Sequence, residues 1–439
     1  MDDEGKQTNI LTIVHMDLCT GCGTCCAFCL HDAIFMREDL SQGILVPGVD
    51  TIKCSSCGTC LRLCPGYEVD FHKLNSYFYG RQPELPLLGN YVQCLSGMAN
   101  NHKISNSVSS GGIVTQLLIF ALKKSFITGA LVTRMSGSDP LKTESLIATT
   151  TEEIVSAAGS KYCPCSANVS LRQLQRKAGK LAVVGLPCHV HALRKAMLIF
   201  PWLRERISLI IGLFCAHSTS YRGTEAVVRR LKLQRNQVSS IAYRGCGWPG
   251  KLSLTLSNGG LVQIPYSRSF RAYYPLFDSP ICVPWRCMFC QDHFNELSDI
   301  SVGDAWLPDY SHGKIGRSLF IVRTETAMAM LKEAVLQNEI SVRAIQPERV
   351  IKSQSRAVKV KTEFWVSRLS AATRIGKKTP VCSVTFGRGP SVSSHILSIL
   401  TLRLALLSRN PHIFAMLTSF PFWLYRLHNM SIEFVNKFA

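Results

Sequence analysis

Two short cysteine-rich stretches decide the fold of the N-terminal part of this chain. Residues 19–29 read CTGCGTCCAFC and residues 54–65 read CSSCGTCLRLCP. Each contains the spacing C-x2-C-x2-C-x3-C, which is typical of proteins that carry two [4Fe–4S] clusters. A tight loop with a cysteine at every third position supplies three thiolates to one cube, and the fourth thiolate comes from the other stretch. The sequence therefore predicts a two-cluster ferredoxin module.

The crossed arrangement predicts two sets of ligands. They are Cys19, Cys22, Cys25 and Cys64 for one cluster, and Cys54, Cys57, Cys60 and Cys29 for the other. Zinc knuckles are the alternative, but zinc sites use cysteine pairs, or a pair with histidines, rather than three cysteines in one loop. Cys26 is left over. Pro65 follows the second stretch whereas Leu30 follows the first, which indicates a looser first loop.

Length and cysteine content limit the number of domains and the cellular compartment that the chain can have. A chain of 439 residues is too long for a ferredoxin alone and predicts two or three domains. Its start, MDDEGKQ, is acidic and lacks an apolar signal-peptide core, so its nineteen cysteines indicate a reducing, cytoplasmic compartment. The longest apolar runs, at 112–122 and 207–216, are too short to cross a bilayer and predict a core helix and a core strand.

The net charge of +20 is unevenly distributed. Residues 1–75 hold five Lys or Arg against ten Asp or Glu, and the remainder holds 44 against 19. A basic body suits an anionic cofactor, an acidic protein partner or a membrane surface. We expect no nucleic-acid partner, because no recognition motif accompanies the charge.

Pattern changes along the chain predict four segments. They are a ferredoxin-type module over 1–75, a linker over 76–91, a large domain over 92–340 and a basic extension over 341–439. In the large domain, strand-like apolar runs alternate with helical patterns such as 170–180 and 225–233, which argues for an α/β fold. Residues 252–265, with Asn258 and Gly259 between alternating apolar residues, predict a hairpin.

The C-terminal extension is basic and partly amphipathic. Residues 341–439 hold fifteen Lys or Arg and only three Asp or Glu, and from 394 onward they are also apolar and aromatic. Such a tail can lie as a peripheral element on the anionic inner face of a membrane, or it can dock on a partner subunit or on its own core. We favour the second interpretation.

Three further cysteine-bearing segments stand out. They are GLPCHVHALRK (185–195), IGLFCAH (211–217) and CVPWRCMFCQD (282–292). The first two follow strand-like runs, at the edge where α/β sheets place their sites. Cys188, Cys215 and the pair Cys287 and Cys290 would supply four thiolates for a third cluster. Buried free thiols are the alternative, because cysteine is among the residues most often buried.

Two segments suit an anionic cofactor. NSVSSGGIVTQLL (106–118) places two serines and two glycines before a helix, where backbone N–H groups suit a phosphate or the edge of a flavin ring. An ordinary N-cap turn has the same composition. Lys161 in GSKYCPCS (159–166) is a candidate cation for a flavin or an anionic substrate, although a lone lysine is usually a solvated surface charge.

Taken in order along the chain, these motifs resemble one known family. SSGG, GSKYCPCS, GLPCHVHALRK, IGLFCAH, YRGCGWPG, CMFCQD and DISVGDAW follow the order seen in the β-subunit family of coenzyme F420-reducing hydrogenase and its relatives, including the input subunit of reduced-F420 dehydrogenase. The resemblance spans about residues 92–330, and the preceding module is similar to that of the dehydrogenase input subunit. The C-terminal extension lies outside it.

The resemblance implies cofactors and their sites. It implies an FAD lined by Ser109, Ser110, Gly111, Gly112 and Lys161, and a third [4Fe–4S] cluster on Cys188, Cys215, Cys287 and Cys290. It assigns no catalytic side chain. The expected fold is thus an α+β ferredoxin-like module, an α/β flavin-binding domain and a mostly helical basic extension. Cys163 and Cys165 have no expected role, and Cys246 interrupts the glycine run of YRGCGWPG.

The implied function is that of an oxidoreductase. Hydride would pass between coenzyme F420 and FAD, and single electrons would pass through the clusters to or from a one-electron carrier or a hydrogenase or dehydrogenase partner subunit. One alternative is a ferredoxin-dependent FAD and iron–sulfur reductase of another substrate. The other is a non-catalytic electron-relay subunit of a membrane complex.

Overall fold

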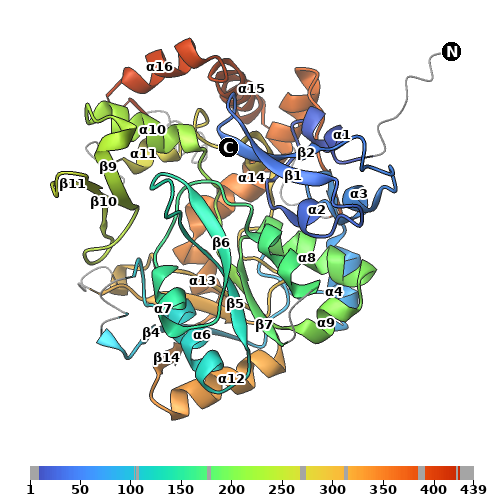
Figure 1. Cartoon of the computed structure of the whole chain (residues 1–439), viewed down its shortest axis with the longest axis vertical. Helices are drawn as coiled ribbons and strands as arrows, with labels where there is room; N and C mark the ends of the chain where they lie inside the picture. Colours follow the sequence, from blue (N-terminus) through green and yellow to red (C-terminus); the bar gives the residue numbers. More distant parts are fainter. Residues whose placement is uncertain are drawn as a thin grey trace.

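A mixed eight-stranded sheet organises the computed structural model of this chain (Figure 1). The structure describes residues 9–102, 104, 108–175, 179–266, 273–310, 315–383, 391–421 and 424–425. The strand order in the sheet is β14-β4-β13-β12-β8-β7-β5-β6. The strands are β4 (Gln93–Ala99), β5 (Gly129–Met135), β6 (Thr143–Ala148), β7 (Leu181–Gly185), β8 (Ile207–Leu213), β12 (Ile300–Asp304), β13 (Ser318–Val322) and β14 (Ile340–Ala344).

The middle of this sheet is parallel. Strands β5, β7, β8 and β12 run in one direction, whereas β6, β13, β4 and β14 pair antiparallel with their neighbours. Parallel strands need cover on both faces and therefore carry continuous apolar runs, as β8 does with ISLIIGL. The predicted core strand at 207–216 is confirmed. The carboxyl ends of the four parallel strands meet at one edge of the sheet, where α/β folds place their sites.

Helices cover both faces of the sheet. One face carries α6 (Ile113–Lys123), α7 (Thr151–Ser156) and α12 (Glu325–Leu336), and the other carries α8 (Pro187–Ile199) and α9 (Trp202–Arg206). Helices α10 (Tyr221–Arg230) and α11 (Tyr274–Phe277) pack instead in a separate apolar core with residues of 238–266. The predicted core helix at 112–122 is confirmed as α6, which packs into the largest apolar core together with α12. The helical pattern at 170–180 is instead a 3-10 helix, η1 (Ala167–Gln175), and residues 176–178 lie outside the described residues. The side chains of Asn168 and Ser170 donate hydrogen bonds to distant segments, at Thr24 Oγ1 (2.8 Å) and the Ser145 carbonyl (3.0 Å).

A small antiparallel sheet stands beside the large one. It consists of β9 (Val238–Ala242), β10 (Lys251–Leu256) and β11 (Leu261–Pro265). Strands β10 and β11 form the hairpin expected at 252–265, and Gly259 has φ +84° in its turn. That backbone region favours glycine, because a Cβ atom is strained there.

The ferredoxin module repeats one local plan twice. Its elements are α1 (Leu11–His15), α2 (Thr24–Ala27), β1 (Ile34–Asp39), β2 (Ile44–Val49), α3 (Thr59–Leu63), β3 (Glu68–Val69) and α4 (Phe71–Tyr79). A short helix starts inside each cysteine stretch, directly after a glycine with positive φ, Gly23 at +82° and Gly58 at +69°. Helix α4 continues through the boundary expected after residue 75, and β14 begins at the boundary expected after 340.

Apolar packing holds the module on the body. Leu63 and Leu74 of the module share one core with Leu193 of α8 and Ile210 of β8. Phe28 stacks on Phe200, with ring centroids 5.6 Å apart. In Figure 1 the module accordingly lies against α8 and α9 on one side of the body.

Charge pairs add to this contact. Asp17 accepts from Lys377 at 3.0 Å and from Arg409 at 2.9 Å, and Glu38 accepts from Lys142 at 2.6 Å. The acidic module and the basic body therefore neutralise each other in part within one chain. Part of the positive charge of the body is therefore paired with the module of the same chain, and only the rest faces other molecules.

The described residues after 344 are mostly helical and pack on the body and the module. Their helices are α13 (Pro347–Ser353), α14 (Ser355–Arg374), α15 (Val392–Leu407) and α16 (Pro411–Ser419), with the short strand β15 (Val381–Cys382) pairing parallel to β3 of the module. Among the described residues no single helix has the length and apolar composition of a membrane span. Only α15 and α16 taken together pass that test, with a bend of 115° between them.

A buried carboxyl group joins helix α4 to the body. The side chain of Glu296 accepts a hydrogen bond of 3.0 Å from the Asn75 amide. Burial and the nearby charge of Asp292 raise the pKa of Glu296 above its ordinary value of 4.5. The folded chain thus holds a proton on Glu296 that the unfolded chain releases.

We expect this carboxyl group to make folding less favourable as pH rises. Above 4.5 the unfolded state releases the proton while the folded state retains it, so stability falls by about 1.4 kcal/mol per pH unit until Glu296 ionises in the folded state. Glu296→Gln keeps a hydrogen-bonding amide and should flatten that loss, measured as the difference in Tm between about pH 5 and about pH 8. The exposed Glu363→Gln serves as the control, and equal pH dependence in all three proteins would contradict the assignment.

Candidate redox centre

The structure brings the first predicted ferredoxin set together. Cys19, Cys22, Cys25 and Cys64 converge at the start of α2 and the end of α3. Burial first, and then the proximity of Cys64 and Cys22, raise the pKa of the Cys19 thiol. Burial and Cys22 raise the pKa of Cys64 to about 11. Backbone N–H groups point at the sulfurs, from Gly21 to Cys19 Sγ at 3.4 Å and from Gly66 to Cys64 Sγ at 3.3 Å.

The second predicted set surrounds a separate hollow nearer the surface. This hollow is lined by Cys29, Cys54, Cys57 and Cys60. Cys57 is exposed, and the Ala33 N–H donates to Cys29 Sγ at 3.4 Å. The crossed grouping expected from the spacing is therefore the grouping that the fold produces. Cys26 joins neither set, because its buried thiol donates to the carbonyl of Ile34 at 3.0 Å.

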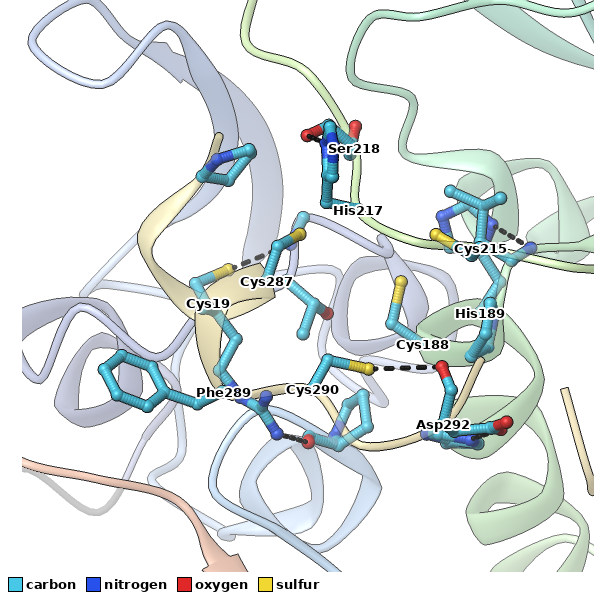
Figure 2. Close-up of a pocket in the computed structure, with 18 of the residues that line it drawn as sticks. Cys19, Cys188, His189, Cys215, His217, Ser218, Cys287, Phe289, Cys290 and Asp292 are labelled. Carbon is cyan, nitrogen blue, oxygen red and sulfur yellow. Dashed lines mark hydrogen bonds and ion pairs between the residues drawn. The ribbon is translucent and has the colours of Figure 1, made fainter. Parts of the chain in front are cut away.

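Three parts of the body supply the third set. Cys188 lies in the first turn of α8, Cys215 follows β8, and Cys287 and Cys290 belong to the turn around η3 (Trp285–Phe289). Figure 2 shows their sulfur atoms around one hollow, with Cys19 of the first ferredoxin set on its wall. The first and third sets are therefore neighbours across the interface between module and body.

Burial and mutual repulsion disfavour ionised thiols in the third set. Burial raises the pKa of Cys215 to about 12, and burial with repulsion from the other cysteines raises the pKa of Cys188 well above its usual range. Buried thiols so close together do not ionise unless positive charge joins them. Within the described residues no three His, Cys, Asp or Glu side chains gather tightly enough for a single metal ion. Four thiols around a hollow are the donor set of an iron–sulfur cube.

Polar groups around the third set were not anticipated from the sequence. His191 Nε2 and Asp292 Oδ2 lie 2.7 Å apart and are both buried, and Lys361 of α14 donates to Cys290 Sγ at 3.3 Å. His191 and Asp292 belong to motifs that the sequence analysis quoted for their cysteines. Lys361 lies 71 residues beyond Cys290 and no local pattern pointed to it.

A cavity of about 910 Å³ opens at the carboxyl edge of the sheet. Its size is that of a small-molecule or cofactor site. Residues at the carboxyl ends of β5, β7, β8 and β12 line it, and so do Ser109, Ser110, Gly112 and Lys161. Leu186, His189 and Cys215 line both this cavity and the hollow of the third set. A ligand in the cavity would therefore lie directly beside the third set.

The SSGG turn forms one wall of the cavity. Gly112 has φ +76° and immediately precedes α6, so the positive end of that helix faces the opening. Ser110 Oγ donates to the Arg317 carbonyl at 2.7 Å. Gly111 is buried behind this wall instead of lining it, and an added Cβ atom would lie 2.5 Å from the Gly97 carbonyl oxygen. Its role is close packing of the turn against β4.

Lys161 lines the cavity but its ammonium is already engaged. It donates to the carbonyl oxygens of Ala158 and Gly159, both at 2.9 Å, and to that of Ala157. These carbonyls follow the C-terminal end of α7, and burial lowers the pKa of Lys161 to about 8. The lysine holds the loop that shapes the cavity and adds positive charge to its wall.

An aromatic wall faces the SSGG turn. Trp248 and Trp306 line the cavity with ring centroids 4.6 Å apart, and Tyr266 lies beside Trp306. Arg244 packs behind these rings, is paired with Asp304, and donates to the Ser109 carbonyl at 2.7 Å. Trp248 and Trp306 belong to the motifs YRGCGWPG and DISVGDAW, and only the fold shows that these two motifs meet at one cavity.

Three family models match the chain. Residues 18–67 match a 4Fe-4S dicluster domain. Residues 94–172 match the N-terminal part of the coenzyme F420 hydrogenase/dehydrogenase beta subunit, and residues 178–348 match its C-terminal part. The last two matches together cover more than half of the 439 residues.

Individual relatives agree with these models. The coenzyme F420 hydrogenase subunit beta of Methanosarcina barkeri is 27% identical over 268 residues, which are 60% of this chain and 85% of the relative. The coenzyme F420-dependent sulfite reductase of Methanocaldococcus jannaschii is 26% identical over 365 residues, 77% of this chain and 50% of the relative. A chain of the solved F420-reducing [NiFe] hydrogenase complex from Methanosarcina barkeri has a similar fold, with a TM-score of 0.52 at 23% identity over 70% of this chain and 99% of that one.

Replacing Cys188 tests the third set. We expect Cys188→Ser to lower the iron and sulfide content of the anaerobically purified protein by one cluster's worth, because a serine hydroxyl is a poor substitute for a buried thiolate ligand. Cys94→Ala is the matched control, since Cys94 is buried but belongs to none of the three sets. Unchanged iron in Cys188→Ser would remove the third cluster from the assignment.

Proposed function

Because the chain belongs to the coenzyme F420 hydrogenase/dehydrogenase beta-subunit family, we propose that it exchanges electrons between coenzyme F420 and a one-electron carrier through FAD and three [4Fe–4S] clusters. One observation carries this proposal. The large cavity shares Cys215 with the hollow of the third set, and that hollow shares Cys19 with the first ferredoxin set. The sites thus follow one another from the cavity towards the surface.

The cavity fits a flavin in its chemistry. Its walls combine the N-terminal end of α6, the cationic Lys161 and the aromatic side chains Trp248 and Trp306. Bound FAD accepts or gives a hydride as a pair of electrons and passes electrons on singly. The α6 terminus would hold the anionic part of the cofactor, and the aromatic wall would hold flat rings in place and keep water from them.

The three cysteine sets would carry single electrons away. Cys188, Cys215, Cys287 and Cys290 stand beside the cavity, the set of Cys19 follows, and the set of Cys57 lies nearest the solvent. Backbone N–H groups of neighbouring residues donate to the sulfur atoms of Cys19, Cys29 and Cys64. Such hydrogen bonds stabilise negative charge on sulfur. The exposed second set is then the place where a carrier or partner subunit exchanges electrons.

The same exposed set also suits the opposite direction. With Cys57 at the surface, a reduced ferredoxin can deliver electrons to the module, from which they would reach the cavity and a substrate other than F420. One relative, of which the match covers 50%, is named a coenzyme F420-dependent sulfite reductase. We therefore retain a ferredoxin-dependent reductase as the second candidate. Either candidate works as a subunit docked to a redox partner on the cytoplasmic side.

An anaerobic assay separates the candidates. The purified chain is analysed for iron, sulfide and flavin, and is then mixed with reduced F420 and an artificial one-electron acceptor. Rapid F420 oxidation with bound flavin is the expected result. Bound flavin without F420 turnover would point to the second candidate, and iron without flavin would leave only a relay function.

Cys188→Ser sharpens this assay, because it interrupts the route after the cavity. We expect the variant to retain flavin and to bleach it with reduced F420 in a single turnover, while reduction of the one-electron acceptor falls at least about tenfold. Cys94→Ala should behave as the parent protein in both half-reactions. Equal losses in both half-reactions of Cys188→Ser would contradict the proposed order of the sites.

A further inference from the structure

Helix α14 closes the third cysteine set from outside the family match. The match to the C-terminal family model ends at residue 348, and α14 begins at Ser355. Trp365 of this helix is buried and donates from its indole to the Phe289 carbonyl at 3.1 Å. The same face of α14 carries Lys361, one turn before, and Arg368, about one turn after. An element that no family model covers is therefore part of the wall around Cys287 and Cys290.

Lys361 is a buried cation in contact with this set. Its side chain is only 2% exposed, and its Nζ donates to Cys290 Sγ at 3.3 Å and to the Asp292 carbonyl at 2.6 Å. Both acceptors lie inside the protein, so the lysine side chain points at the cysteine set and away from solvent.

Arg368 adds a second buried cation. It is 9% exposed, one of its Nη atoms donates to the Val360 carbonyl, and its Nε has no hydrogen-bond partner in the described part of the chain. Among the ion pairs between described residues, none includes Lys361 or Arg368. The nearby Asp292 carboxylate is bound to His191 and to the Glu296 N–H. Two buried cations without a carboxylate partner are costly unless another anion balances them.

We propose that α14 completes the third cluster site, with Lys361 and Arg368 balancing the negative charge of the cluster and raising its reduction potential. This inference rests on the proposed function only in taking the four thiols as cluster ligands. A cube with four thiolates is anionic and becomes more so on reduction, and buried positive charge stabilises the added electron. The C-terminal extension would thus set how readily the cluster beside the cavity accepts an electron.

The alternative is that Lys361 only ties α14 to the loop after Cys290 through the Asp292 carbonyl. Loss of a charge changes the reduction potential of the cluster, whereas loss of a purely structural contact does not. Lys361→Met removes the charge but keeps the length, whereas Lys361→Arg keeps the charge. Lys359→Met is the matched control, because Lys359 lies on the same helix but is exposed. Arg368→Met tests the second cation independently.

The experiment is an anaerobic redox titration of the full chain followed by electron paramagnetic resonance. The signal of the third cluster is the one that Cys188→Ser abolishes, and iron content is measured in parallel. We expect Lys361→Met to lower the ratio of reduced to oxidised third cluster about tenfold at a fixed solution potential, equivalent to about 59 mV for one electron. Arg368→Met should shift it in the same direction, and Lys361→Arg and Lys359→Met should match the parent protein.

Each outcome decides the inference. An unchanged midpoint in iron-replete Lys361→Met and Arg368→Met overturns it. Lys361→Met can instead lose the iron of one cluster. In that case Lys361→Arg decides: if it keeps both the iron and the midpoint potential of the parent protein, the charge effect is supported. If Lys361→Arg also loses the iron, the inference is overturned. The proposed function fails separately: absence of flavin or of F420 turnover leaves the measured shift, and hence this inference, intact.

Discussion

The contact between the first cysteine loop and the body is the constraint on which the other sites depend. Ser166 Oγ donates to the Gly21 carbonyl at 2.8 Å, and the backbone N–H of Asn168 donates to the Cys22 carbonyl at 3.1 Å. On the other side, Arg286 Nε donates to the Gly66 carbonyl at 2.6 Å. Gly23 packs so closely on Val169 that a side chain would not fit there. These contacts hold Cys19 beside the third set, so that the first and third sets line one hollow.

Charge serves this contact as well as the chemistry. Asp17 pairs with Lys377 and Arg409 and so links the C-terminal extension to the module at two points. Helix α14 of the same extension places Lys361 beside Cys290 of the body. The extension is thus linked to both parts of the molecule. Its positive charge is partly consumed inside the molecule, and only the remainder is free to attract an anionic coenzyme or partner.

The parts of the structure that the sequence predicted correctly depend on the spacing of residues that are close together in the chain. The two ferredoxin sets follow from the cysteine spacing in two stretches of eleven and twelve residues, which leaves few arrangements, and the fold brings the same cysteines together. Predicting the third set required the further assumption that Cys188 and Cys215 follow strands whose carboxyl ends lie at one edge of the sheet. The strands that precede them, β7 and β8, are paired in parallel. The SSGG turn was placed correctly before α6, but one of its members, Gly111, faces the sheet and not the cavity. The helix expected at 170–180 failed because a 3-10 segment there is held by side-chain contacts to the module.

The sequence alone thus predicted the two ferredoxin sets and the strands that end at one edge, because these depend on residues close together in the chain or on regular alternation, whereas the third set was predicted mainly through the resemblance to a known family. The cavity wall of Trp248 and Trp306, the pairing of Asp17 with the extension and the approach of Lys361 to Cys290 arise only when distant segments pack. No local pattern encodes such contacts, since each depends on the positions of two elements rather than on either one. The buried charges that surround the third set are therefore a property of the folded chain.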